Sequence, residues 1–111
     1  MKFIAIDSVG FTTEVDEIKK AFSFIEEVDK DADKYIFSDY KNGVCYVGGL
    51  NEVKPYAIAA YLDYRKEQCE LDDLVDDLAE FIQEFDVRLR NAERRECSLS
   101  FQRYRYEIFK V

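Results

Sequence analysis

The sequence predicts a small α+β domain in which an antiparallel sheet of four to five strands carries two helices packed on one face. Two segments repeat apolar residues every three or four positions, as amphipathic helices do. Short stretches rich in Val, Ile, Phe and Tyr lie between and around them, and an Asn-Gly pair marks a hairpin between two of these stretches. This arrangement of strands and helices favours an antiparallel sheet over a regular βαβ alternation.

The chain is expected to form a single domain over residues 1–111. At 111 residues, with 48% hydrophobic and 15% aromatic residues, it can bury a core without disulfide or metal support. No Pro/Ser-rich linker, repeat or low-complexity tract divides it. No apolar run is long enough to span a bilayer or act as a signal peptide, so we expect a cytoplasmic protein.

The first half of the chain predicts a strand, a helix and a hairpin. Residues 2–7 alternate as a strand with both faces partly buried. A helix is expected over about 13–29, with Thr13 and Asp16 as a capping pair. Its apolar stripe comprises Val15, Ile18, Phe22, Ile25 and Val28. A strand pair over 35–40 and 44–48 should follow.

The hairpin is expected to turn on the two residues Asn42 and Gly43. With such a turn, Tyr40 lies opposite Cys45, and Asp39 lies opposite Tyr46.

Residues 56–65 fit either a helix or a strand. Ile58 and Leu62 have helical spacing, whereas Ile58, Ala60, Leu62 and Tyr64 would share one face of a strand. We favour a strand, because three tyrosines follow a turn-like stretch ending at Pro55. A helix here would instead give the order βαββαβ, the ferredoxin-like pattern.

The longest helix is predicted over about 72–93, with Asp72 as its N-cap. Its apolar stripe comprises Leu74, Val75, Leu78, Phe81, Ile82, Phe85 and Leu89. The acidic start and arginine-rich end match the helix dipole. Residues 97–111 then predict one long strand whose apolar face switches near Arg103, which a bulge or a strand shared between two environments would explain.

The charge pattern argues against binding to phosphates. The net charge is −8 and the pI is about 4.6, so neither nucleic acid nor an anionic membrane is an expected direct partner. Residues 1–87 carry −12 and residues 88–111 carry +4. The domain should therefore be electrostatically polarised, unless folding interleaves the two segments.

Cysteine and histidine content excludes a common class of metal site. Cys45, Cys69 and Cys97 are widely spaced and no histidine is present, so a zinc site is not expected and the thiols should be reduced. Asp29 to Asp33 resembles the start of an EF-hand loop, but Lys34 and Tyr40 stand where that loop needs Gly and a bidentate acid. We predict no metal or cofactor.

The most enzyme-like feature is the segment from Asp72 to Asp77. Helical spacing places Asp72 beside Asp76 and Asp73 beside Asp77, where paired carboxylates could bridge Mg²⁺. These few residues resemble the aspartate-rich motif of isoprenoid synthases. Capping and dipole effects already account for acids at a helix start. Because histidine and nucleophile motifs are missing as well, we expect a protein that is not an enzyme and keep a small carboxylate-metal enzyme as an alternative.

The C-terminal segment interleaves arginines with aromatics, a composition found in single-strand nucleic-acid platforms. On one long strand, Arg103 and Arg105 would face away from Tyr104 and Tyr106. That separation disfavours a platform, since cations and rings must meet the same ligand.

The acidic surface leads to the favoured function, an inhibitor or nucleic-acid-mimicking decoy that docks on a basic, nucleic-acid-binding partner protein. Tyr40, Tyr61 and Tyr64 are expected to be exposed anchors among the acids. The other expected partner-binding residues are Asp63, Asp72, Asp73, Asp76, Asp77, Glu80 and Glu84. In size and charge the chain resembles small phage or mobile-element proteins that block host nucleic-acid machinery. The alternative is an assembly protein, such as a homodimer, that self-associates through the C-terminal strand edge.

Overall fold

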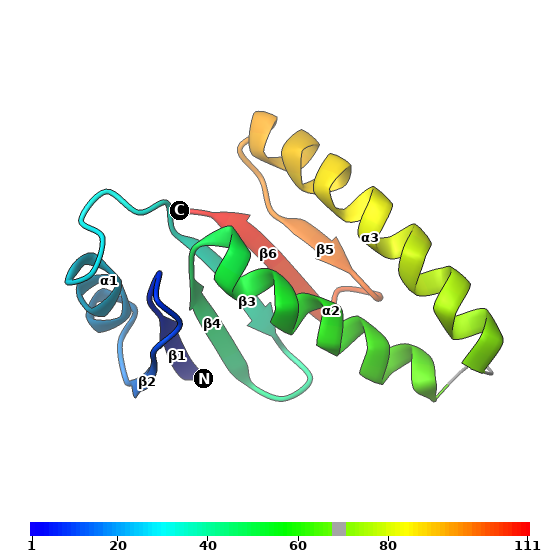
Figure 1. Cartoon of the computed structure of the whole chain (residues 1–111), viewed down its shortest axis with the longest axis horizontal. Coiled ribbons are helices and arrows are strands. Elements are labelled where there is room, and N and C mark those ends of the chain that lie inside the picture. The colour runs from blue at the N-terminus through cyan, green and yellow to red at the C-terminus, as the bar shows by residue number, and fades with distance from the viewer. Residues whose placement is uncertain (68–70) are drawn as a thin grey trace.

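The chain folds into a mixed β-sheet with helices on both of its faces (Figure 1). The computed structural model describes residues 1–67 and 71–111, with the side chains of 1–67 and 73–111. Within these residues the sheet has six strands in the order β2-β1-β4-β3-β6-β5. The strands are β1 (Lys2–Ile6), β2 (Thr12–Val15), β3 (Tyr35–Asp39), β4 (Val44–Gly48), β5 (Leu99–Phe101) and β6 (Tyr106–Lys110). The helices are α1 (Ile18–Glu26), α2 (Leu50–Lys66) and α3 (Leu71–Arg94).

The α+β class is confirmed, but the sheet is not wholly antiparallel. Strand β1 runs parallel to β4, with Phe3 opposite Cys45 and Ala5 opposite Val47, and all other pairs are antiparallel. Both faces of β1 carry apolar side chains. Such a strand is stable inside a sheet, between two neighbours and two covering layers.

The prediction that both helices pack on one face is wrong. Alternate residues of β3 belong to different cores: Ile36 joins the cluster under α1, and Phe37 joins the cluster under α2 and α3. The first cluster contains Ala5, Ala21, Ile25, Ile36, Cys45 and Val47. The second contains Tyr35, Phe37, Val53, Ala57, Ala60, Tyr64, Phe85, Leu89, Ala92, Leu99, Phe101, Tyr106 and Ile108. Because β3 is apolar on both sides, each side needs a cover.

The start of the predicted 13–29 helix is an edge strand instead. Thr13 and Val15 are half-buried while Thr12 and Glu14 are exposed, and β2 pairs antiparallel with β1. Thr and Val favour strands, and this local alternation outweighs the capping pattern. Helix α1 therefore begins later, at Ile18.

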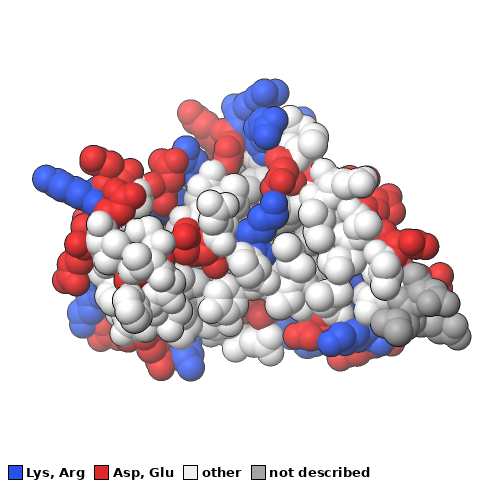
Figure 2. Space-filling model, in the orientation of Figure 1, with Lys and Arg blue, Asp and Glu red and all other residues white. Residues whose placement is uncertain are grey.

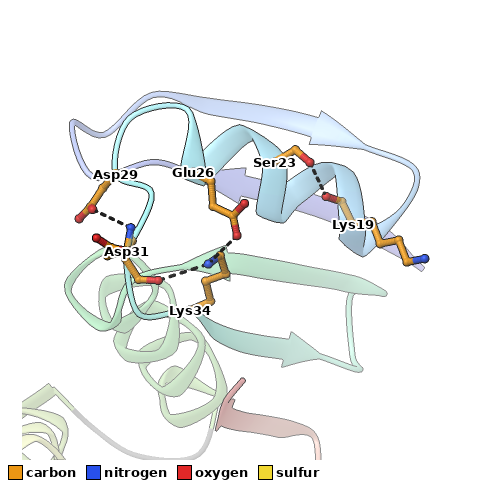
Figure 3. A network of polar contacts seen from close by, with 7 residues as sticks. Lys19, Ser23, Glu26, Asp29, Asp31 and Lys34 are labelled. Carbon is orange, nitrogen blue, oxygen red and sulfur yellow. Dashed lines mark hydrogen bonds and ion pairs between the residues drawn. The ribbon is translucent and has the colours of Figure 1, made fainter.

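The end of α1 forms a compact polar loop (Figure 3). Lys34 Nζ binds the Glu26 carboxylate at 2.9 Å and donates to the Ala32 carbonyl at 3.3 Å. The Asp29 carboxylate accepts the Asp31 backbone N–H at 3.2 Å. Within this segment, the Glu26 carboxylate thus pairs with Lys34, and the Asp29 carboxylate binds the backbone.

The β3–β4 hairpin is confirmed, but the register differs from the predicted one. Asp39 lies opposite Val44, so the loop holds four residues, 40–43. A type I′ turn needs positive φ at both central residues, and here Gly43 has it (φ 69°) but Asn42 does not. The Asp39 carboxylate accepts the backbone N–H of Asn42 at 3.0 Å and its side-chain amide at 2.8 Å, which fixes the longer loop.

Residues 56–65 lie in α2, so the favoured strand is wrong. The buried residues of α2 are Val53, Ala57, Ala60, Tyr61 and Tyr64, which have helical spacing. The ferredoxin-like alternative is also wrong, because α1 and α2 cover opposite faces and β2, α3 and β5 extend its order. No helix among the described residues is long and apolar enough to cross a bilayer.

The last two predicted elements differ in outcome. Helix α3 matches the predicted 72–93 helix to within a residue at each end, and it begins at Leu71, ahead of the expected Asp72 cap. The long 97–111 strand is wrong: β5 and β6 form an antiparallel hairpin, and the apolar face switches at Arg103 because the chain turns there. Cys45 is buried in the core and Cys97 is exposed, both as free thiols, whereas Cys69 lies outside the described residues.

Candidate functional site: the cleft between α3 and the β5–β6 turn

Four of the acids on the longest helix share one face of α3. Asp73, Asp76, Glu80 and Glu84 follow each other at spacings of three and four residues and are all exposed. At 1.5 Å rise per residue they form a line with a carboxylate roughly every 6 Å. None of them pairs with a described Lys or Arg. The side chain of Asp72 lies outside the described residues.

Asp77, the remaining acid of this set, is only partly exposed. Its carboxylate pairs with the Arg65 guanidinium of α2, and its backbone carbonyl accepts the Tyr61 hydroxyl at 3.3 Å. Asp77 therefore connects α2 and α3. The four exposed acids of α3 are not used in this contact between the helices.

Two of the three tyrosines expected to be exposed anchors are buried. Tyr61 is 7% exposed and stacks on Phe81 with ring centroids 4.0 Å apart. Tyr64 is 6% exposed and lies under the Arg105 guanidinium, 5.2 Å from the ring. The physical reason is that 56–65 is helical, and the helix turns both rings toward the core.

Tyr40 and Asp63 lie apart from the acids of α3. Tyr40 is half exposed, but its hydroxyl donates to the Glu107 carboxylate at 2.6 Å. The register pairs Glu107 with Ser38 on the face that α1 covers, which is opposite to α3. Asp63 is exposed on α2 and lines a separate cleft. The predicted residues thus fall into three places.

A cleft of about 450 Å³ lies between the acidic face of α3 and the β5–β6 turn. We call it the α3 cleft. Phe81 and Phe101 pack at 5.6 Å in its base, with the Tyr61 ring beneath Phe81. The residues that line it are Tyr61, Asp77, Glu80, Phe81, Glu84, Arg88, Ser100, Phe101, Gln102, Arg103 and Tyr104.

The turn on the other side of this cleft is strained. Gln102, Arg103 and Tyr104 have φ values of 51°, 57° and 65°. Left-handed backbone costs an L-residue roughly 1–2 kcal/mol, and three in succession without glycine is unusual. Such strain clusters at binding and active sites. It holds Tyr104 at 82% exposure on the rim of the cleft.

Arg105 fixes the turn to the rest of the molecule. Its backbone N–H donates to the Gln102 carbonyl at 3.2 Å, and its carbonyl accepts the Tyr40 N–H at 2.9 Å. Its guanidinium covers the Tyr64 ring of α2. Sequence reasoning missed Tyr104 as an exposed anchor, although the switch of apolar face at Arg103 was a signal that the strand does not continue.

Folding interleaves the acidic and basic parts of the chain. Glu80 and Glu84 from the acidic part share the α3 cleft with Arg88 and Arg103 from the basic part. Figure 2 shows acidic side chains at both ends of the long axis, with Lys and Arg among them. The separation of charge expected between the two parts of the chain is therefore reduced.

Among the described residues, no group of three His, Cys, Asp or Glu side chains lies close enough together to hold a metal ion.

Comparison with protein-family models, with curated proteins and with solved structures gives no match. Function must therefore be argued from the site itself.

Proposed function

We propose that this chain is a non-enzymatic interaction module whose α3 cleft binds a basic segment of a partner protein. The observation that carries the proposal is that Glu80 and Glu84, which pair with no described Lys or Arg, stand on the wall of a cleft with aromatic rings in its base. Tyr104 stands exposed on the opposite rim.

Glu80 and Glu84 suit an Arg or Lys side chain, against the opposing charge of Arg88 and Arg103 in the same cleft. A guanidinium group can lie over the Phe81 ring while its N–H groups donate to Glu80 or Glu84. Charge alone gives a fast encounter but little affinity. Tyr104 supplies the large, rigid surface that binding energy concentrates on in protein interfaces.

The density of charge favours one basic segment over imitation of a whole duplex. The acids of α3 present a carboxylate roughly every 6 Å, whereas duplex DNA carries one charge per about 1.7 Å. An inhibitor of this kind would act by covering the basic segment with which a nucleic-acid-binding protein holds phosphates. We favour this inhibitor function, in which the chain replaces the nucleic acid at one basic segment of the partner.

The test measures binding of a labelled twelve-residue peptide of Arg, Lys and Ala to the full chain by fluorescence anisotropy. Binding should weaken as salt is raised from 50 to 300 mM. Glu80→Gln combined with Glu84→Gln should weaken it about tenfold or more, and Tyr104→Ala should weaken it at every salt concentration. The matched control, Glu17→Gln with Glu27→Gln, removes the same charge at the two ends of α1 and should change affinity less than twofold.

The control pair decides the outcome. Equal losses for the α3 pair and the α1 pair would mean that net charge, not the cleft, attracts the peptide. No binding at 50 mM salt would reject the proposal. Inhibition is tested next: a basic protein captured from lysate should lose bound DNA when wild-type chain is added, but not when the α3 double variant is added.

A further inference from the structure

A second cleft, of about 480 Å³, lies on the sheet face beneath α2, beside the β3–β4 hairpin. It shares no lining residue with the α3 cleft. We call it the tyrosine cleft. Its lining residues are Asp39, Lys41, Asn42, Tyr46, Tyr56, Ala59, Ala60, Asp63, Lys66, Glu67 and Tyr106.

Tyr106 brings a buried ring and an unsatisfied hydroxyl to this cleft. The side chain is 1% exposed, and its ring packs on Phe37 at 6.0 Å and Phe101 at 5.2 Å. Its hydroxyl forms no hydrogen bond with any described residue, and it is not sealed from solvent. Buried tyrosine hydroxyls usually have a partner. The partner of this hydroxyl must therefore come from outside the protein, either as water or as a bound group.

Two further tyrosines add to the same wall. Tyr46 and Tyr56 stack with ring centroids 4.1 Å apart. Within the described part of the chain, neither hydroxyl has a hydrogen-bond partner. Burial, with Tyr56 and Asp39 nearby, raises the pKa of Tyr46 above its usual value. Burial and the charges of Asp39, Asp63 and Glu67 do the same to the pKa of Tyr106, although Arg105 opposes them. Burial is the largest cause of both shifts, and the nearby carboxylates add to it.

Carboxylates surround the rings. Asp39 is 5% exposed, and Asn42 occupies one acceptor position on each of its oxygens, which leaves others open. Asp63 is exposed and forms no ion pair with a described residue. Glu67 pairs with Lys41 at 3.8 Å. Lys66 opposes these acids, and the carboxylates still outnumber the lysines by three to two.

We propose that the tyrosine cleft binds a cationic nitrogen group, an alkylammonium or alkylguanidinium, between the tyrosine rings and Asp39 and Asp63. Aromatic faces attract such cations, and carboxylates and tyrosine oxygens accept their N–H groups. The group could belong to a free polyamine or to a Lys or Arg side chain. Both present the same chemistry, so the experiment separates them.

The experiment follows the full chain by two-dimensional NMR with the tyrosine rings labelled, during titration with butylammonium, propylguanidinium, spermidine and the blocked peptide Gly-Arg-Gly. Resonances of Tyr46, Tyr56 and Tyr106 should shift together and saturate in the millimolar range or below. Tighter binding of spermidine would identify a free polyamine, and tighter binding of the peptide would identify a protein side chain. Butanol and inorganic phosphate, as neutral and anionic controls, should produce no saturating shift.

Variants separate recognition from folding. Tyr106→Phe keeps the buried ring and removes only the hydroxyl, so it should fold and bind the cation several-fold more weakly. Asp63→Asn should weaken binding about tenfold. Lys66→Gln should tighten it, because it removes a like charge. Tyr35→Phe removes a hydroxyl that binds Glu93 outside the cleft and should leave affinity unchanged.

Three results would overturn the inference. One is the absence of saturable tyrosine shifts with every amine and guanidine. The others are a Lys66→Gln variant that binds more weakly and a saturable response to phosphate, since each of these shows a site for anions. Because these residues do not line the α3 cleft, none of the three results bears on the proposed function.

Discussion

Two buried carboxylates, Asp7 and Asp39, hold the loops at opposite ends of the sheet. Asp7 is 3% exposed, and one of its oxygens accepts the backbone N–H groups of Val9 and Phe11, each at 3.0 Å. Asp39 holds the β3–β4 loop through Asn42. In both loops a side chain takes the place of backbone partners that a sheet would otherwise supply.

Replacement of Asp7 tests how much one of these carboxylates contributes. Asp7→Ala leaves two backbone donors without their acceptor, so the free energy of unfolding should fall by about 2 kcal/mol. Urea denaturation measures it. Ser8→Ala, one position along and exposed, should change stability by less than about 0.5 kcal/mol. If Asp7→Ala had an equally small effect, the loop would not depend on the carboxylate.

Glu107 gives the protein an acid-sensitive contact. Hydrogen bonds from Ser98 and Tyr40 lower the pKa of Glu107 below its ordinary value of 4.5. Its contribution to stability is therefore full above pH 4.5 and is lost as pH falls through the lower folded pKa. The unfolding free energy of the wild type should fall more steeply below pH 4.5 than that of Glu107→Gln. Identical slopes in urea titrations from pH 2.5 to 7 would refute this.

At the scale of elements, a substitution in the strained β5–β6 turn should stabilise the protein, in contrast to the loss expected for Asp7→Ala. Arg103→Gly relieves left-handed backbone strain and should raise the unfolding free energy by about 0.5–1 kcal/mol, after the entropy of glycine is subtracted. Arg90→Gly, at an exposed position of helix α3, should instead lower it by about 1 kcal/mol. Thermal and urea unfolding compare the two. A loss of stability in Arg103→Gly would show that the arginine side chain outweighs the strain.

Elements whose pattern is local could be predicted from sequence. Helix α3 repeats apolar residues over about four turns, from Leu74 to Leu89, and the face that holds Glu80 and Glu84 follows directly from that period. Residues 56–65 fit two periods at once, and burial of Tyr61 against Phe81 of α3 and of Tyr64 under Arg105 decided between them. That decision depends on tertiary packing, which local propensity does not contain.

The two clefts show the same division. The acids of the α3 cleft lie on one helix and were predicted. The exposed position of Tyr104 depends instead on left-handed backbone angles, for which the sequence has no signal such as a glycine or an Asn-Gly pair. The tyrosine cleft was not predicted. It brings together Asp39, Tyr56 and Tyr106 from a hairpin, a helix and a strand that are far apart in the chain. Long-range strand pairing created that site.

At the scale of the whole molecule, the edges of the sheet bear on self-association. Strand β6 lies inside the sheet, between β3 and β5. The C-terminal strand edge through which an assembly protein would self-associate is therefore the edge of β5. It has only three residues, and the opposite edge strand, β2, has four. Short edge strands are poor templates for pairing with another chain.

We therefore predict a monomer of 13.1 kDa at micromolar concentration. Sedimentation velocity gives the mass, and small-angle scattering should give a radius of gyration slightly above the 14.3 Å of the Cα atoms, once side chains and hydration are included. A concentration-independent mass near twice this value would favour the assembly alternative over an interaction module.

The pairing of β3 with β6 determines when the core can form. Tyr35 lies opposite Lys110 and Asp39 opposite Tyr106, so this side of β3 stays unpaired until residues 106–110 have been made. Contacts this distant in sequence make folding slow, on the order of milliseconds to seconds. Until β6 has been made, the edge of β3 that pairs with it is exposed and unpaired in the growing chain. Yield in bacteria should therefore depend on chaperone supply and temperature more than on the final stability of the folded protein.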